Sequence, residues 1–309
     1  MSPLLHTAPE VAEAVAAGRP VVALETTLVT HGFPRSEGLQ LADALEGEVR
    51  RQGAVPATIG VLEGALRVGL SRGELERLAA EDVAKLGPAN LGARIASGRP
   101  GSTTVGATLI AAAAARIRVF ATGGIGGVHR GDAFDISADL LALARHPVAV
   151  VCAGAKAVLD LPRTREALET LGVPVLGFGT DELPAFYRRS SGLPVDARFD
   201  SVGALAAAVA SHFALETGVG AVIGNPIPTA DELDTEVYES ALSGALADAE
   251  ATGVAGRDVT PFLLEEVRRR TGGRSLESNR ALLLSNARLA GQLAVELAEH
   301  CAAHHTPRA

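Results

Sequence analysis

The fold of this chain is decided by a run of six apolar residues, Val148-Ala149-Val150-Val151-Cys152-Ala153. Such a run without a charge is typical of a strand that is buried on both faces of a parallel sheet. Lys156 stands three residues beyond it, so the chain directs a buried strand towards an amine. A desolvated lysine has a lowered pKa and becomes a nucleophile able to condense with a sugar aldehyde. Lys156 is therefore a candidate catalytic residue.

Similar apolar runs recur along the chain and alternate with stretches of helical spacing. The predicted strands are Val21–Leu28, Thr58–Leu62, Val119–Thr122, Val148–Ala153, Val173–Phe178 and Val219–Ile223. The predicted helices are Leu39–Arg51, Arg72–Ala80, Thr104–Arg116, Ala138–Ala144, Arg163–Leu171, Val202–Leu215 and Asp231–Ala251. This alternation predicts an α/β fold with a mostly parallel sheet.

One part of the sheet is expected to be antiparallel. Thr58–Leu62 and Leu66–Gly69, joined through Glu63 and Gly64, have the pattern of a hairpin, so the sheet is predicted to be mixed. The capping-box sequence Ser-Arg-Gly-Glu at residues 71–74 marks the start of the next helix. No Pro/Gly/Ser-rich linker and no fixed-period repeat divides the sequence, which favours a single domain over residues 1–309.

Composition argues against several classes of function. The net charge of −8 and the 3% aromatic content argue against a nucleic-acid partner, because such binding uses clustered basic residues and stacking side chains. Residues 1–20 contain Glu10 and Glu13 and no continuous hydrophobic segment, so no signal peptide or membrane contact is expected, and the location is predicted to be cytoplasmic. Cys152 and Cys301 form no CxxC pattern, and Cys152 is interpreted as a packing residue.

A carboxylate interrupts the first predicted strand at Glu25. Burying a carboxylate is costly unless it is paired or neutral, and a raised pKa would let Glu25 act as a general acid near neutral pH. The alternative is that the strand ends at Leu24 and that Glu25 lies on a solvated turn. His31, a few residues further on, is interpreted as a structural hydrogen-bonding residue.

Small hydroxyl residues precede an Ala-rich helix at Ser102-Thr103-Thr104. The exposed N–H groups and the dipole of a helix start suit an anion such as phosphate, and Lys85 is a candidate for a nearby point charge. For the hydroxyls the alternative is ordinary N-capping. For Lys85 it is a solvated position at a helix end.

Four glycines follow the strand Val119–Thr122, in the segment Gly123-Gly124-Ile125-Gly126-Gly127. Such a loop lets the backbone approach a ligand closely. Its spacing is not GxGxxG, and the chain has no GxxxxGK[ST] sequence, so a dinucleotide or nucleoside triphosphate site is not expected. His129 and Arg130 come next and are candidates for holding anionic or carbonyl groups, with simple surface residence as the alternative.

Other polar residues form weaker patterns. Asp135 and Asp139 would share a face if a helix began before Asp135, and such oxygen ligands suit Mg²⁺ or Mn²⁺, although capping of a helix start is the alternative. Asn225 follows a strand, where α/β sheets bind ligands. Asn279 and Asn286 would share a face of one helix, where amides often only join packed elements.

Five blocks together resemble the pseudouridine-5′-phosphate glycosidase family. They are ALETT with THG (residues 23–32), TGGIGGVHRG (122–131), DISAD (135–139), VCAGAK (151–156) and GNPIP (224–228). Their order and spacing also match, and the similarity extends from about Glu10 to Glu296. The resemblance implies a three-layer α/β/α fold and a homotrimer.

The resemblance also implies roles for single residues. Glu25 would be the proton donor, Lys156 the nucleophile and Asp135 the residue that holds a Mn²⁺, for which Mg²⁺ is a possible substitute. The substrate-binding candidates, from the resemblance or from the patterns above, are Lys85, Thr104, Val105, His129, Arg130, Ser137, Ala138, Asp139 and Asn225. Residues 132–134 form a shorter connection than is usual in the family, which bears on where the metal lies relative to Arg130.

The implied reaction cleaves pseudouridine 5′-phosphate to uracil and ribose 5-phosphate. Ribose C1′ is joined to uracil C5 by a carbon–carbon bond, so the usual glycosidase mechanism, in which an acid protonates a leaving oxygen, does not apply directly. Lys156 would bond to C1′ of the opened sugar while Glu25 moves protons. Two alternatives are a phosphosugar lyase or aldolase that uses the same lysine and a non-catalytic phosphosugar-binding protein.

Overall fold

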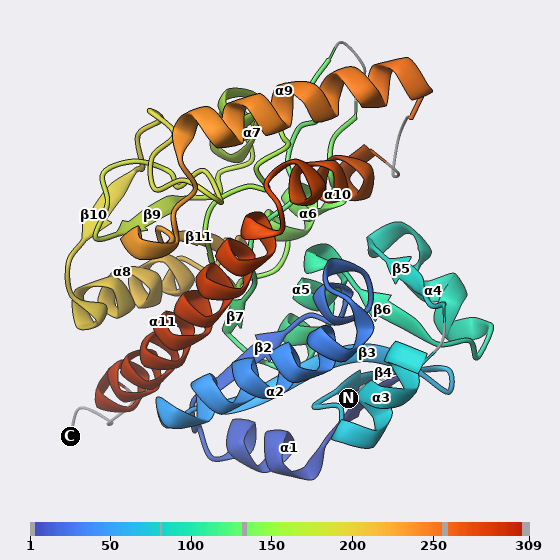
Figure 1. The fold of residues 1–309 in the computed structure, drawn as a ribbon. Coiled ribbons are helices and arrows are strands. Elements are labelled where there is room, and N and C mark those ends of the chain that lie inside the picture. The colour runs from blue at the N-terminus through green and yellow to red at the C-terminus, as the bar shows by residue number, and fades with distance from the viewer. Residues whose placement is uncertain (1–3, 81, 132–134, 255–258, 305–309) are drawn as a thin grey trace.

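The computed structural model describes residues 4–80, 82–131, 135–254 and 259–304. Its strands form one sheet in the order β1-β4-β3-β2-β7-β8-β11-β9-β10, with β6 beside β3 and β5 beside β6 (Figure 1). The strands are β1 (Leu5–Thr7), β2 (Val21–Leu24), β3 (Val55–Leu62), β4 (Ala65–Val68), β5 (Ala84–Leu86), β6 (Gly101–Thr103), β7 (Val119–Ala121), β8 (Ala149–Cys152), β9 (Val175–Phe178), β10 (Ala197–Phe199) and β11 (Ala221–Gly224).

The sheet is mixed and mostly parallel, as the sequence predicts. Within the described residues, only β3 with β4 and β3 with β6 pair in antiparallel fashion. The β3–β4 hairpin is the predicted one. It turns at Glu63 and Gly64, whose φ angles of 52° and 70° are the positive values that a tight hairpin turn requires.

The helices include all seven predicted segments, with ends displaced by a few residues at most. They are α1 (Pro9–Ala16), α2 (Arg35–Arg51), α3 (Arg72–Ala80), α4 (Pro88–Ala96), α5 (Val105–Ala114), α6 (Ala138–Leu143), α7 (Leu161–Thr170), α8 (Val202–Ala214), α9 (Thr235–Thr252), α10 (Val259–Arg270) and α11 (Arg274–His304), with a π-helix η1 (Leu28–Gly32) and a 3₁₀-helix η2 (Thr229–Asp231). The capping box of α3 is confirmed, since Ser71 N–H donates to Glu74 and the Glu74 N–H donates to Ser71 Oγ.

Helices cover both faces of the sheet, which makes three layers, α/β/α. On one face, α11 packs between α2 and α8 and crosses β2, β7 and β8 (Figure 1). On the other face, α5 packs against α6 and against β2 and β3, as right-handed crossovers require. Because both faces are covered, every residue of β2, β3, β7, β8 and β11 is buried.

The first strand is shorter than its apolar pattern predicts. It ends at Leu24, not at Leu28. The reason is Thr26, whose hydroxyl donates to the carbonyl of Ile59 at 2.8 Å and accepts the N–H of Thr103 at 2.9 Å. This side chain ties the turn to β3 and β6, and the chain leaves the sheet and enters the π-helix η1.

The winding of the sheet reverses between β2 and β7. From β2 the chain passes through α2 to β3 on one side, whereas from β7 it passes through α6 to β8 on the other. In open α/β sheets, ligands bind at the carboxyl ends of the strands where this reversal occurs. The ends of β2 and β7, at Leu24 and Ala121, are therefore where a site is expected.

Within the described ranges, no helix combines the length and apolar character needed to cross a bilayer.

Candidate active site

A cavity of about 230 Å³ lies where the winding reverses. Its walls come from the ends of β2, β7 and β8, from η1, from the β5 and α5 region, and from α10 and α11. The residues that line it are Glu25, Thr27, Leu28, His31, Gly32, Lys85, Thr104, Thr122, Gly123, Gly124, Lys156, Phe186, Tyr187, Leu264, Glu265, Arg268, Ser275, Leu276, Asn279 and Leu283.

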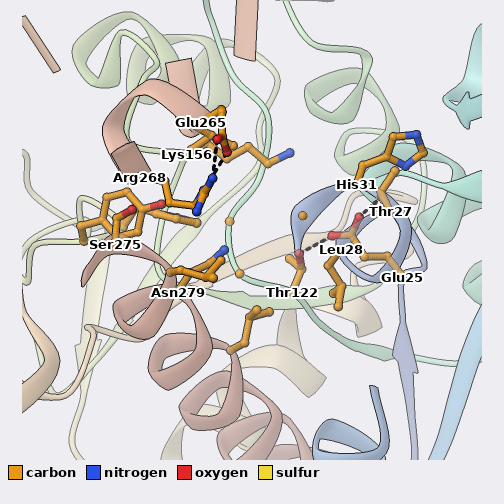
Figure 2. Close-up of a pocket in the computed structure, with 18 of the residues that line it drawn as sticks. Glu25, Thr27, Leu28, His31, Thr122, Lys156, Glu265, Arg268, Ser275 and Asn279 are labelled. Atoms are coloured by element: carbon orange, nitrogen blue, oxygen red, sulfur yellow. Dashed lines mark hydrogen bonds and ion pairs between the residues drawn. The ribbon is translucent and has the colours of Figure 1, made fainter. Parts of the chain in front are cut away.

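Glu25 is a buried carboxyl group in the wall of this cavity. Only 6% of the residue is exposed, and its two oxygens contact the hydroxyls of Thr122, at 2.5 Å, and of Thr27 (Figure 2). Burial raises the pKa of Glu25, against the opposing effects of the Lys156 charge and of the Thr122 hydroxyl, and Asp139 adds to the increase. The strand does end at Leu24, but the solvated turn of the alternative interpretation is wrong.

Lys156 lies across the cavity from Glu25. Its backbone is held by the glycine loop, because Lys156 N–H donates to the carbonyl of Ile125 at 3.0 Å and Ile125 N–H donates to that of Gly154 at 3.1 Å. The side chain extends from the side of Arg268 towards the side of Glu25 (Figure 2). The residue is half-buried, so the side chain is more solvated than the apolar run alone predicts.

The chain contains only two lysines, Lys85 and Lys156, among 28 basic residues. Both line the cavity. All other basic side chains, apart from histidine, are arginines. This bias is a signal in the sequence that marks both residues, independently of strand and helix patterns.

The π-helix η1 brings His31 to the cavity. Such helices are rare and often occur at functional sites. His31 Nδ1 lies 2.6 Å from the hydroxyl of Thr30. Partial enclosure by the cavity wall and the charge of Lys85 lower the pKa of His31, so the neutral ring is favoured there. His31 therefore makes the predicted hydrogen bond and also faces the cavity.

Lys85 and Thr104 line the same cavity at the start of α5. Thr104 occupies the N-cap position, but its hydroxyl donates to the carbonyl of Leu86 at 3.0 Å and does not cap the helix, so the N-capping interpretation is wrong for this residue. Ser102 and Thr103 are fully buried. The Ser102 hydroxyl accepts from Thr30 and the Thr103 hydroxyl donates to Ile59, so neither faces the cavity.

The glycine loop has two different halves. Gly123 and Gly124 line the cavity. A Cβ at Gly126 would lie 2.2 Å from the hydroxyl of Ser137, and one at Gly127 would lie 2.3 Å from that of Thr164. The second pair of glycines is therefore needed for close packing within the protein, not for access of a ligand.

Asp139 joins this loop to α5. Its two oxygens accept the N–H groups of Gly106, at 2.7 Å, and of Gly126, at 2.9 Å, and the residue is 5% exposed. Ser137 is the N-cap of α6 and accepts the Asp139 N–H. Ala138 begins the helix and Val105 is buried. None of the predicted substrate-binding residues in this cluster lines the cavity.

Asp135 lies outside α6, which begins at Ala138, so the condition for Asp135 and Asp139 to share a helix face is not met. The Asp135 carboxylate is 39% exposed and lies 3.8 Å from His129 Nδ1. Arg130 donates to the carbonyl of Val158 at 3.3 Å. None of these three lines the cavity, and the short connection at residues 132–134 lies outside the described residues.

Donors for a metal ion are few. In the part of the chain that the structure describes, no group of three or more His, Cys, Asp or Glu side chains is placed to hold a metal. Both oxygens of Asp139 are engaged with backbone N–H groups. Asp135 alone fits only an ion that retains most of its waters, which is the habit of Mg²⁺ and similar hard cations.

The C-terminal helices supply the wall that sequence reasoning misses. Arg268 and Glu265 of α10 form a two-point ion pair at 2.5 and 2.7 Å, and Asn279 of α11 lines the same cavity (Figure 2). The prediction that Asn279 and Asn286 share a face holds, but only Asn279 lines the cavity. Amphipathic spacing would identify α11 as a helix, but no local motif marks it as part of a site.

Asn225 and Asn286 connect α11 to the sheet. Asn225 donates to Asn286 at 2.9 Å, and Asn286 donates to the carbonyl of Thr122 at 2.8 Å. Asn225 does lie at a strand end, but its amide binds α11 and does not line the cavity. Cys152 is fully buried, and burial raises the pKa of its thiol to about 12, which agrees with its interpretation as a packing residue.

The sequence is similar to known proteins over nearly its whole length. The family model for indigoidine synthase A like proteins matches residues 10–296. A pseudouridine-5′-phosphate glycosidase from Methylobacterium nodulans is 54% identical over 298 residues, which cover 96% of this chain and 88% of the relative. Another from Paracoccus denitrificans is 52% identical over 303 residues, which cover 96% of this chain and 100% of the relative.

Solved structures share the fold. Prealnumycin C-glycosynthase AlnA, in complex with ribulose 5-phosphate, superposes with a TM-score of 0.91 at 41% identity, covering 98% of this chain and 100% of that one. An indigoidine synthase A-like protein from Thermotoga maritima superposes with a TM-score of 0.87 at 36% identity, covering 96% of this chain and 97% of that one.

Proposed function

Because the chain belongs to the pseudouridine-5′-phosphate glycosidase family, we propose that it reversibly cleaves pseudouridine 5′-phosphate to uracil and ribose 5-phosphate. The observation that carries this proposal is the pairing, across one cavity, of a buried acid, Glu25, with an amine, Lys156. Cleavage of a carbon–carbon glycosidic bond needs both, because the leaving carbon must gain a proton while C1′ loses its bond to that carbon.

The proposed reaction passes through a lysine adduct. The amine of Lys156 bonds to C1′, and the bond from C1′ to the ring oxygen breaks as Glu25 protonates that oxygen. Glu25, now ionised, takes a proton from the new adduct's nitrogen and passes it to uracil C5 as the C1′–C5 bond breaks, which leaves C1′ as an iminium ion on Lys156. Water adds to the iminium and releases ribose 5-phosphate, so one water is consumed for each substrate. Glu25 acts first as an acid and then, ionised, as a base.

The phosphate is proposed to lie at the end of the cavity formed by Lys85 and Thr104. Support comes from the position of both residues beside the start of α5, where helix polarity favours an anion. Binding the phosphate there would use a remote part of the substrate to hold C1′ against the amine. The opposite end, with Asn279, Ser275 and Arg268, offers amide, hydroxyl and guanidinium groups for the base.

Three further parts of the proposal rest on the family resemblance. A Mn²⁺ or Mg²⁺ would be held by Asp135 with water completing its shell, and it would order waters and polar groups near the sugar phosphate. The assembly would be a homotrimer, and the location cytoplasmic. Sedimentation of the purified protein tests the assembly, and a monomer would contradict that part alone.

The decisive experiment is an assay of uracil release from pseudouridine 5′-phosphate. Lys156→Ala should lose activity by several orders of magnitude, and Glu25→Gln should keep substrate binding and lose turnover. Borohydride reduction during turnover should attach the sugar to Lys156. Since Lys85 is the only other lysine, peptide mapping has only two side chains to distinguish.

The same assay separates the alternatives. A phosphosugar lyase or aldolase would act on sugar phosphates that lack a base, and a binding protein would hold the phosphosugar without releasing uracil. Full activity in Lys156→Ala would contradict the nucleophile, and no uracil from the wild-type protein would contradict the function.

A further inference from the structure

The hydrogen bonds around Glu25 identify where its proton lies. Thr27 Oγ1 contacts two oxygens, the backbone carbonyl of Thr103 at 2.7 Å and Oε2 of Glu25. A hydrogen bond between two oxygen atoms requires one hydrogen atom between them. A hydroxyl carries one hydrogen and a carbonyl carries none, so the contact with Thr103 uses the only hydrogen of Thr27.

The contact between Thr27 and Glu25 then needs a hydrogen from the carboxyl group. The other oxygen, Oε1, contacts the hydroxyl of Thr122 at 2.5 Å. For the Thr122 hydroxyl, Glu25 is the hydrogen-bond partner within the described residues. Thr122 is therefore a donor, and Oε1 accepts from it. One oxygen of Glu25 thus has the surroundings of a carbonyl and the other has those of an acidic hydroxyl.

We propose that Thr27 is a positioning residue that holds Glu25 in the protonated state before substrate binds, with the proton on Oε2 donated to Thr27 Oγ1. This inference deepens the proposed role of Glu25 as the acid, and in that respect it rests on the proposed function. In the ionised state, either the Thr103 carbonyl or Oε2 would lose its hydrogen bond in a buried environment, which carries a desolvation cost.

Charged groups on several elements surround Glu25. Lys156, beyond β8, favours the ionised form, and Asp139 of α6 opposes it. The same cavity is lined by His31 of η1, Lys85 of β5, and the ion pair of Glu265 and Arg268 on α10. Burial outweighs the Lys156 charge and raises the pKa of Glu25, which favours the neutral acid.

Two isosteric substitutions should shift the pKa of Glu25 in opposite directions. Thr27→Val removes the acceptor of the acid proton, so the pKa should fall by about one unit. Thr122→Val removes a donor that stabilises the ionised form more than the neutral one, so the pKa should rise by about one unit. Thr27→Ser keeps the hydroxyl and should restore the wild-type value.

The measurement is infrared titration of the carboxylic-acid carbonyl band in the substrate-free protein, with Glu25→Gln as the blank. A rise of the Glu25 pKa in Thr27→Val, or no change, would overturn the proposal. So would a wild-type Glu25 that is ionised throughout the neutral range, which tests the idea even if a variant fails to fold. Because no substrate is used, absence of uracil release would contradict the function and leave this result standing.

Discussion

The burial of Glu25 has an energetic cost that depends on pH. Its folded-state pKa is raised above the unfolded value, so the folded protein binds a proton that the unfolded chain has already released. Stability is therefore greatest below the unfolded pKa and falls as pH rises through the interval between the two values. Each unit of separation between the two pKa values is worth about 1.4 kcal/mol.

Glu25→Gln should remove this loss of stability at higher pH. Its free energy of unfolding should exceed that of the wild type by about 1 kcal/mol or more at neutral pH, with the gap closing as the pH falls towards the unfolded pKa. Denaturant titrations at several pH values would measure it. Glu265→Gln is the control, because Arg268 lowers the pKa of Glu265 and no gain is expected. An equal gap at all pH values would contradict the prediction.

Gly154 places Lys156 through a backbone that only glycine adopts easily. Its φ is +86°, and a Cβ there would lie 1.9 Å from the carbonyl oxygen of Pro184. Gly154→Ala should therefore lower the free energy of unfolding by about 3 kcal/mol and displace the lysine. Gly172 has a similar φ, +70°, and no atom lies within 4 Å of an added Cβ. Gly172→Ala should therefore lower the free energy of unfolding by only about 1 kcal/mol. Thermal melts compare the two, and equal losses would show that the Pro184 contact is unimportant.

At this scale, the sequence predicts which residues are unusual but not how they meet. Glu25 and Lys156 are visible because each is a polar residue at the end of an apolar run. The hydroxyls of Thr27 and Thr122 carry no such signal, since threonine is common beside strands. The contact of Thr122 with Glu25 depends on the pairing of β2 with β7, which brings together two residues 97 apart in the sequence.

Among the elements, α11 has the largest effect on the site. It spans 31 residues, crosses three strands and carries two asparagines with different tasks. Asn286 is buried and holds the carbonyl of Thr122 to α11, whereas Asn279 faces the cavity. The same face of one helix thus supports the sheet at one turn and the site two turns earlier.

Asn286→Ala should destabilise the protein by about 2 kcal/mol, because the buried Thr122 carbonyl and the Asn225 amide both lose a partner. Asn279→Ala should leave the melting temperature nearly unchanged and raise KM for the nucleotide. Calorimetry and steady-state kinetics measure the two effects. If Asn279→Ala proved the less stable of the two, this division of tasks would be refuted.

Elements with long periodic patterns are predictable, and short ones are not. The strands β1, β5, β6 and β10 have three residues each and lack the uninterrupted apolar run that makes the equally short β7 recognisable. β5 carries Lys85, so the element that completes the proposed phosphate-binding end of the cavity is among those missed. The end of β2 is missed because Thr26 bonds to β3 and β6, which no local signal reveals.

For the whole molecule, stability comes from a buried sheet covered on both faces. One large apolar cluster extends across β2, β7, β8 and β11. The α/β class and the mixed sheet are predictable from the alternation of patterns alone. The three-layer arrangement follows from the family resemblance, since spacing does not fix which face each helix covers.

Removal of divalent metal should leave the fold intact. The described residues include no cluster of three metal-binding side chains, so no structural metal is expected there. A chelator should therefore change the melting temperature by less than about 1 °C, because an ion held by a single carboxylate binds weakly and adds little to the stability of the folded state. If Asp135 holds an ion, the chelator should instead raise KM, and Asp135→Asn should reproduce that effect. A large loss of melting temperature would reveal a structural metal.

The scarcity of lysine has a consequence for the exterior of the molecule. Open-chain aldoses, such as the pentose phosphate released in the proposed reaction, slowly glycate surface amines. Here both side-chain amines line the cavity, and the remaining positive charge is carried chiefly by arginine. Guanidinium groups stay protonated and do not form imines with simple sugars. The outer surface should thus resist glycation by the pentose phosphate that the proposed reaction releases, even after prolonged exposure.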